Sequence, residues 1–200
     1  MEKMNVSIVF IDDDPNQARD AALDELEMVV DEIVKFQDSQ KGLDYIKSHL
    51  EKRMIVLLDL GFSRKMLDGH KVLAGIREIS DLVPVIIWSG KDIYPKDLAD
   101  LFEHHAFSFI SKDDDSEVIV DTVRKAYIVL QNDIRSVIED WASRQNPDSM
   151  DKPYMVSADG HSYSLNDILM SVRKQDDFGK EFVKNIMELA TDLFLRRKKG

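Results

Sequence analysis

The sequence contains no cysteine and has few residues that break regular structure, with eight glycines and five prolines among 200 residues. The absence of cysteine excludes disulfide scaffolds and thiolate metal sites, and it fits a reducing compartment. Hydrophobic residues make up 44% of the chain and charged residues 32%, a composition that excludes disordered and fibrous proteins. We therefore expect a globular protein with a substantial core.

Long apolar runs are also missing. The first run, Val6 to Ile11, ends at three aspartates and is too short for a signal peptide, and no later run approaches the length of a membrane span. The chain has 27 basic and 38 acidic residues, and its net charge of -11 repels phosphate backbones and anionic lipid surfaces. We expect a cytoplasmic protein, and we do not expect it to bind nucleic acid or a membrane.

Short apolar runs alternate with amphipathic stretches as far as about residue 128, a rhythm typical of β/α units on a parallel sheet. The runs are unbroken because helices cover both faces of such a sheet. They predict five strands, at Val6–Ile11, Ile33–Phe36, Met54–Leu58, Pro84–Trp88 and Phe107–Ile110. Helices are predicted near 16–27, 40–50, 69–79 and 96–105 and from 116 onward. The predicted fold class is α/β, with a doubly wound five-stranded parallel sheet.

The helix that begins at residue 116 is predicted to continue past the sheet as a helical extension over 129–147. No glycine or proline interrupts 116–146, and Asn146-Pro147 ends the helix. Its apolar residues follow a heptad spacing, at Val120, Val123, Tyr127, Leu130, Ile134, Val137 and Trp141. This seam over 120–141 favours a homodimer in which the same helix of two chains pairs, and packing against the chain's own C-terminal segment is the alternative.

Residues 148–200 predict a small α+β module. A hairpin is expected around the Asp159-Gly160 turn, because glycine supplies the positive φ that such a turn needs. Ser164 to Asp167 loosely matches a capping box and opens a helix to about Lys174, and a longer helix follows over about 178–197. This region has equal numbers of acidic and basic residues, so the net negative charge belongs to 1–145. A unit of this size is marginally stable alone.

Residues that carry chemistry follow the predicted strands, at Asp12, Asp13, Asp14, Asp59, Ser89 and Lys112. The carboxyl ends of parallel strands meet at one edge of a sheet, so we expect these side chains to lie together. Gathered carboxylates need a cation, and oxygen donors without His or Cys suit Mg²⁺. Such an ion leaves positions for phosphoryl oxygens, beside the charge of Lys112 and the hydroxyl of Ser89. Asp59 is then placed to accept a phosphoryl group as nucleophile.

In their order and spacing, the segments IVFIDDDP, VLLDL, DGHKVLAGIRE, PVIIWSG and SFISKD resemble the response-regulator receiver domain of two-component signalling over about residues 4–128. The resemblance implies a flavodoxin-like sheet in the order 2-1-3-4-5 and a phospho-receiver domain over 1–128. It also implies a magnesium site formed by Asp12, Asp13, Asp59 and the backbone carbonyl of Gly61. Asp59 would be the phosphoacceptor and Lys112 the phosphoryl-binding lysine.

The resemblance further implies a conformational switch at Ser89 and Phe109. The phosphodonor would be a histidine kinase or a phosphotransfer protein, and a protein effector would bind 146–200. Such a receiver catalyses only its own phosphorylation and dephosphorylation, so we do not class it as a conventional enzyme.

The chain departs from the family's pattern in three places. The loop LGFSRKML after Asp59 is two residues longer than usual and lacks the usual proline, which bears on the Gly61 carbonyl contact and on the phosphoryl lifetime. Lys112 is followed by Asp113 where the family has proline, so we expect a trans peptide bond there. His105 replaces a glycine before the fifth strand.

Three alternatives stay open at this point. Asp12 to Asp14, with Ser89 and Lys112, also matches phosphatases that resemble haloacid dehalogenases, although that interpretation leaves Asp59 without a role. A degenerate receiver would act as a protein-binding module independent of phosphorylation. Transcriptional control is a third alternative, although 146–200 is too short for a winged-helix DNA-binding domain.

Overall fold

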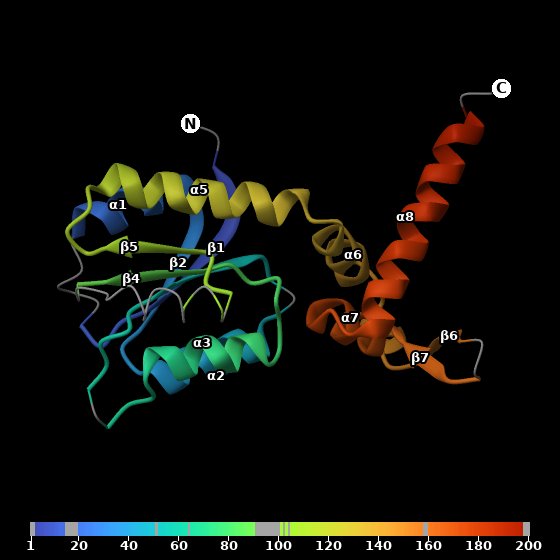
Figure 1. The fold of residues 1–200 in the computed structure, drawn as a ribbon, viewed down its shortest axis with the longest axis horizontal. Coiled ribbons are helices and arrows are strands. Elements are labelled where there is room, and N and C mark those ends of the chain that lie inside the picture. The colour runs from blue at the N-terminus through green and yellow to red at the C-terminus, as the bar shows by residue number, and fades with distance from the viewer. Residues whose placement is uncertain are drawn as a thin grey trace. The chain divides into compact units, whose positions relative to one another are not determined.

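The computed structural model describes residues 3–14, 20–50, 52–63, 65–90, 101, 103, 105–157 and 160–197. The chain forms two compact units, Met1–Asn132 and Asp133–Gly200. Figure 1 shows the helices and strands of each unit.

The first unit contains a five-stranded parallel sheet in the order β2-β1-β3-β4-β5. Its strands are β1 (Met4–Ile11), β2 (Val30–Phe36), β3 (Met54–Leu58), β4 (Val85–Ser89) and β5 (Ser108–Ser111). Every residue of β3 and β4 is buried, which explains their unbroken apolar sequence. The predicted fold class and strand order are therefore confirmed.

Helices cover both faces of this sheet. Helices α1 (Asp20–Val29) and α5 (Ser116–Asn132) pack together on one face, and α2 (Ser39–Ser48) and α3 (Gly69–Arg77) pack together on the other. Each face has its own apolar cluster, and the cluster beneath α1 and α5 contains Phe10 and Trp88 with ring centroids 5.3 Å apart. Most of the helix predicted at 96–105 lies outside the described residues.

The prediction of a single helix over 116–146 is wrong. The structure has two helices there: α5 ends at Asn132, and α6 (Ile134–Ser143) begins after a break. Asp133 has extended backbone angles, with φ -79° and ψ 122°, and its carboxylate accepts a hydrogen bond from the Arg135 N–H at 2.9 Å. Asp133 is therefore an N-cap that starts a new helix.

The predicted heptad seam is interrupted at the same place. Val123 and Leu130 of α5 are buried in the core of the first unit. In α6 the buried apolar residues are Ile138 and Ala142, whereas Val137 of the predicted seam is 52% exposed. The seam is therefore not carried by one unbroken helix, and the homodimer stays a prediction.

The second unit contains α6, a short 3₁₀ helix (Pro147–Ser149), the hairpin of β6 (Pro153–Val156) and β7 (Ser162–Ser164), and helices α7 (Leu165–Lys174) and α8 (Asp177–Arg197). The predicted hairpin and both helices are confirmed. Gly160 has the expected positive φ of 87°, and Asp159 lies outside the described residues. Ser164 and Asp167 form a reciprocal capping box at the start of α7.

Helices α7 and α8 approach closely at Gly179. A Cβ atom built there would lie 2.1 Å from the carbonyl oxygen of Ser171, so only glycine permits this crossing. The core of this unit is small and centres on Ile138, Ala142 and Leu169. Within the described residues, none of the helices has both the length and the apolar character needed to cross a bilayer.

Candidate functional site

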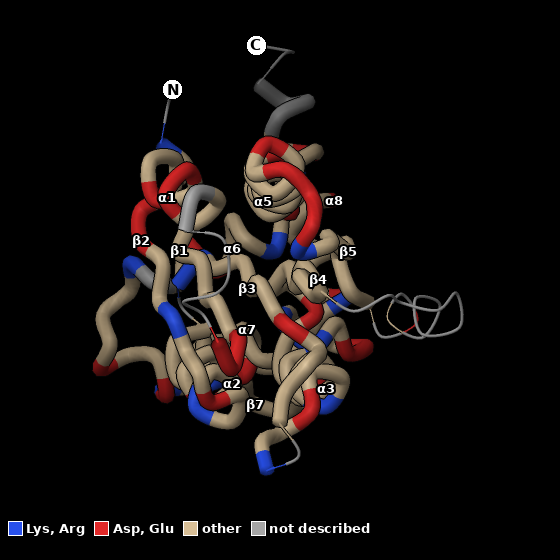
Figure 2. Tube along the Cα trace, turned by 90° about the vertical axis from the view of Figure 1, so that its left-hand side faces the viewer, with Lys and Arg blue, Asp and Glu red and all other residues tan. Residues whose placement is uncertain are grey.

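Three aspartates meet at the carboxyl ends of β1 and β3, the edge of the sheet toward which Figure 2 looks. Asp12 and Asp13 follow β1, and Asp59 follows β3. One carboxylate oxygen from each lies within 4.8 Å of the others. Asp12 and Asp59 are buried, and Asp13 is half-buried. Adjacent parallel strands thus bring Asp59 beside two consecutive carboxylates that are far from it in the sequence.

Lys112 supplies positive charge to this cluster. Its Nζ lies 2.6 Å from Asp12 Oδ2 and 2.9 Å from Asp59 Oδ2. Asp12 Oδ2 is buried and accepts no well-aligned hydrogen bond, so its contact with Lys112 is an ion pair. Burial alone would lower the pKa of Lys112, but the two carboxylates outweigh burial and raise it. The lysine is therefore held charged beside the phosphoacceptor predicted from the sequence.

Asp59 is held as a carboxylate. Burial would raise its pKa, but hydrogen bonds from Lys112, from the Gly61 backbone and from the Ser89 hydroxyl lower the pKa below the usual value. The Gly61 N–H donates to Asp59 Oδ1 at 3.1 Å, and Lys112 donates to Asp59 Oδ2 at 2.9 Å. An ionised carboxylate is the form that acts as a nucleophile.

Strand register fixes the backbones that carry these groups. The Asp59 N–H donates to the Ile11 carbonyl at 2.9 Å, and the Lys112 N–H donates to the Ser89 carbonyl at 3.0 Å. Ser89 is almost fully buried at 1% exposure, at the end of β4. The Lys112–Asp113 peptide bond is trans, as expected. Five of the six side chains that the sequence analysis placed at this edge therefore come together there, whereas Asp14 is exposed and lies outside the carboxylate cluster.

Two further predicted residues lie nearby. Phe109 of β5 is half-buried and packs against the apolar cluster beneath α2 and α3. Its switch role stays a prediction, as does metal binding by the Gly61 carbonyl. The structure does show that the Gly61 N–H is bound to Asp59.

Gly69, at the start of α3, supports the site and was missed by the sequence analysis. A Cβ atom there would lie 2.5 Å from the Asp59 carbonyl oxygen and 2.7 Å from the Leu60 Cα. Helix α3 can therefore approach the phosphoacceptor backbone only with glycine at this position. The signal that could have revealed it is the Asp68-Gly69 pair, in which Asp68 is the N-cap of α3.

Arg77 supports the neighbouring loops and was also missed. Its guanidinium donates to the carbonyl oxygens of Ser80, Val83 and His105, at 3.0, 2.9 and 2.8 Å. His105 has a positive φ of 55°, in the left-handed region that favours glycine. The position where the family has glycine thus keeps a conformation suited to glycine although histidine occupies it.

Comparisons with known proteins identify this arrangement. The sequence pattern of the response regulator receiver domain matches residues 8–124, more than half of the chain. The chain belongs to the response regulator receiver family. A comparison of the sequence with curated proteins gives no match.

Solved structures of receiver domains share the fold. The CheY-like receiver domain from Methanospirillum hungatei is 15% identical, with a TM-score of 0.56 over 64% of this chain and 97% of its own. A receiver domain from Clostridium thermocellum is 20% identical, with a TM-score of 0.54 over 62% and 94% of the two chains. The signal receiver domain of a putative LuxO repressor from Vibrio parahaemolyticus is 15% identical, with a TM-score of 0.54 over 70% and 99%.

The residues of this receiver fit a divalent cation. Receiver domains generally bind Mg²⁺ at an acidic pocket, and here Asp12, Asp13 and Asp59 form an all-oxygen cluster. The haloacid dehalogenase-like interpretation fails to account for Asp59, which contacts Lys112 at the centre of the site.

Proposed function

We propose that the chain is a response regulator that accepts a phosphoryl group on Asp59. The observation that supports this most directly is the ionised Asp59 carboxylate, 2.9 Å from Lys112 and beside Asp12 and Asp13. Lys112 and Ser89 are placed to bind the oxygens of a group transferred to Asp59. A metal-binding cluster alone would not require a lysine and a buried hydroxyl at the same carboxylate.

In the proposed reaction, an oxygen of Asp59 forms a bond to the phosphorus of the donor. The bond from phosphorus to the donor breaks, and its electron pair leaves with the donor group. The product is an aspartyl phosphate, whose added negative charge Lys112 partly neutralises while the Ser89 hydroxyl donates a hydrogen bond. Asp12 and Asp13, with Asp59, would hold Mg²⁺, which supplies further positive charge for the phosphoryl oxygens.

The proposed partners follow from the family. A histidine kinase or phosphotransfer protein in the cytoplasm would supply the phosphoryl group. The chain would catalyse only its own phosphorylation and dephosphorylation. Reorganisation of Ser89 and Phe109 would then change binding of a protein effector to 146–200. Such a switch requires two packings close in free energy that the phosphoryl group biases differently.

Acetyl phosphate with Mg²⁺ tests this proposal, with the intact mass of the full chain as the readout. The wild-type chain should gain one phosphoryl group, and Asp59→Asn should gain none. Asp14→Asn is the matched control, because Asp14 is exposed and lies outside the three-carboxylate cluster. An unchanged wild-type mass would overturn the proposal and favour a receiver that acts without phosphorylation, and so would uptake by Asp59→Asn.

A further inference from the structure

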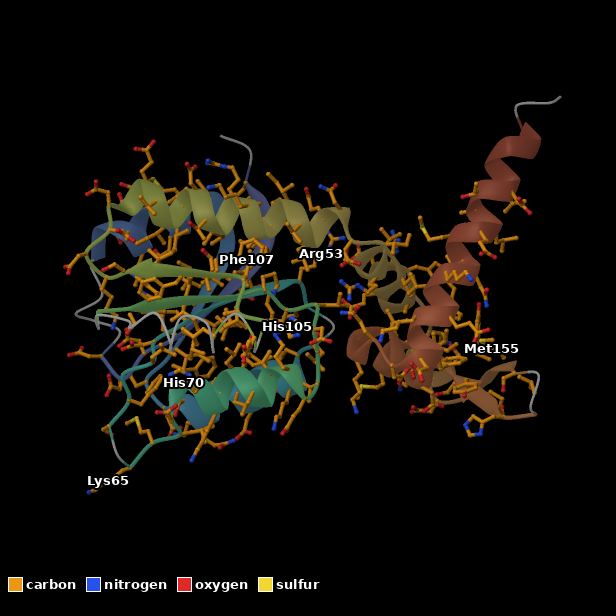
Figure 3. All side chains as sticks on the ribbon, in the orientation of Figure 1. Arg53, Lys65, His70, His105, Phe107 and Met155 are labelled. Carbon is orange, nitrogen blue, oxygen red and sulfur yellow. The ribbon has the colours of Figure 1, made fainter. Side chains whose placement is uncertain are left out.

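Two described segments of one loop, residues 61–63 and 65–67, follow Asp59, and the first of them lies against the carboxylate cluster. Near its ends, Phe62 and Leu67 pack against the apolar cluster beneath α2 and α3. The hydroxyl of Ser39, which is fully buried, donates to the Leu67 carbonyl at 2.7 Å. The Met66 N–H donates to the Ser63 carbonyl at 2.9 Å, which closes a turn within the loop. Lys65 points away from the domain at the loop's outer end, as Figure 3 shows.

This anchored loop contacts two of the three aspartates directly, and its contact with Asp59 is the Gly61 N–H described above. The backbone N–H of Ser63 donates to Asp13 Oδ2 at 3.2 Å. Asp12 and Asp59 are buried and contact Lys112, whereas Asp13 is half-buried. Asp13 is thus the most exposed of the three aspartates, and the loop that is longer than usual for the family holds it through the Ser63 N–H.

We propose that the Ser63 backbone N–H positions Asp13 for cation binding. The proposal deepens the phosphorylation function proposed above and rests on it. A carboxylate has about four lone-pair positions, so one hydrogen bond leaves both oxygens able to bind a cation. A side chain already held in its binding orientation loses less conformational freedom when the ion arrives. Groups that orient metal ligands in this way affect metal affinity by about tenfold or more.

Two substitutions at one position isolate the N–H group. Ser63→Pro removes the backbone donor, since proline has no N–H, and Ser63→Ala keeps it while removing only the hydroxyl. We expect Ser63→Pro to weaken Mg²⁺ binding to the full chain by about tenfold in calorimetric titration, with Ser63→Ala unchanged. Equal affinities for Ser63→Pro and the wild type would overturn the proposal, and so would an equal loss in Ser63→Ala.

A double-mutant cycle separates positioning from distortion of the loop. In an Asp13→Ala background, Ser63→Pro should cause no further loss of Mg²⁺ affinity, because the side-chain oxygen that accepts from the Ser63 N–H is gone. An equal further loss in that background would show that proline acts by distorting the loop. If Ser63→Pro does not fold, the wild-type Ser63 amide resonance provides the readout. It should shift with the same midpoint as Mg²⁺ binding, and an unshifted resonance would overturn the proposal.

Phosphorylation kinetics add a second readout. Ser63→Pro should accept the phosphoryl group from acetyl phosphate slowly at low Mg²⁺ and at the wild-type rate at saturating Mg²⁺. A rate that stays low at saturating Mg²⁺ would contradict a role limited to cation binding. The two proposals fail separately: a wild-type chain that binds Mg²⁺ but takes up no phosphoryl group disproves only the phosphorylation function. Uptake with unaltered Mg²⁺ affinity in Ser63→Pro disproves only the role of Ser63.

Discussion

The two units of the chain differ most in the depth of their cores. In the first unit, every residue of β3 and β4 is buried. The helices on both faces of the sheet pack onto it through two large apolar clusters. In the described part of the second unit, the apolar cluster has three buried members, with Met150, Phe182 and Val183 packed partly against it. Three further buried apolar residues lie on α7, at Leu165, Ile168 and Val172. Large apolar side chains remain exposed there, at Val137, Trp141, Tyr154, Val156, Met187, Leu189 and Leu193.

Because of this difference, we expect the first unit to be a rigid scaffold and the second unit to be only marginally stable. A deep core holds the Asp59 backbone and the Lys112 backbone in fixed register, which the chemistry of the first unit requires. A thin core gives little stability, so small changes in packing should unfold the second unit first. The sequence has two tryptophans, of which Trp88 lies in the first unit and Trp141 in the second. Their fluorescence reports on each unit separately.

The largest effect is expected from Gly179→Ala in the second unit. The new Cβ would meet the Ser171 backbone at 2.1 Å, so α7 and α8 must move apart. We expect the free energy of unfolding of this unit to fall by about 2 kcal/mol, as in other overpacked sites, with the first unit unchanged. Urea unfolding followed through Trp141 in a Trp88→Phe background measures it.

Gly75→Ala in α3 of the first unit is the matched control. The Cβ there would meet Leu43 Cδ2 at 2.8 Å, at the end of a flexible side chain, and alanine favours helix over glycine by roughly 1 kcal/mol. Its net effect should be small. If the free energy of unfolding fell by similar amounts in both variants, the depth of the core would not determine how much stability a glycine-to-alanine change costs.

A smaller effect is expected from pH. Burial raises the pKa of Glu139, and its ion pair with Arg173, at 2.6 Å, opposes that rise without cancelling it. The stabilising effect of a raised pKa is fully present below the unfolded value of about 4.3 and is lost as pH rises through the folded value. The second unit should therefore gain stability from Glu139 as pH falls from 7 toward about 4.3.

Asp59 in the first unit should respond in the opposite sense and at lower pH. Its lowered pKa stabilises the fold above the unfolded value of about 3.9, and this contribution is lost as pH falls through the folded value. Thermal unfolding followed through each tryptophan checks both predictions. Glu139→Gln should abolish the gain in the second unit, and a gain that persists in this variant would assign it to another group.

The smallest effect is expected where each unit has a non-glycine residue with positive φ. His105 has φ 55° and Gln175, the C-cap of α7, has φ 50°. The left-handed conformation costs a non-glycine residue about 1–2 kcal/mol, which substitution by glycine removes. Glycine also makes the unfolded chain more flexible, which lowers the free energy of unfolding by about 0.4–1 kcal/mol and offsets part of that gain. His105→Gly and Gln175→Gly should each stabilise their own unit by about 0.5 kcal/mol in urea unfolding. Alanine at either position should give no gain, since it keeps the strain.

The sequence predicted the sheet well because its central strands are buried on both faces, as the match at Met54–Leu58 shows. It placed β2 less well: the strand begins at Val30 rather than Ile33. The buried Val30 of this edge strand is followed by two exposed acidic residues, Asp31 and Glu32, which interrupt the apolar run. The break after α5 was missed because neither glycine nor proline marks it. The available signal was Asp133 before Ile134, an N-cap within an otherwise helical pattern.

The candidate site was predictable to the extent that strand ends determine it. Five residues lie at the end of a strand or directly after one, so their convergence follows from parallel topology alone: Asp12, Asp13, Asp59, Ser89 and Lys112. The contacts from Ser63 and Arg77 were not predictable, because they depend on how loops fold back onto the sheet. Loop conformation leaves no periodic pattern in a sequence.

The close contact at Gly69 also determines how a movement of the Asp59 backbone is transmitted to α3. Main chain lies directly on main chain where α3 begins over Asp59 and Leu60, with no side chain between them that could change rotamer and absorb a shift. A sub-ångström movement of the aspartate backbone would therefore push the helix as a rigid rod. Charge added at one carboxylate would then reach the far end of α3 as a mechanical displacement.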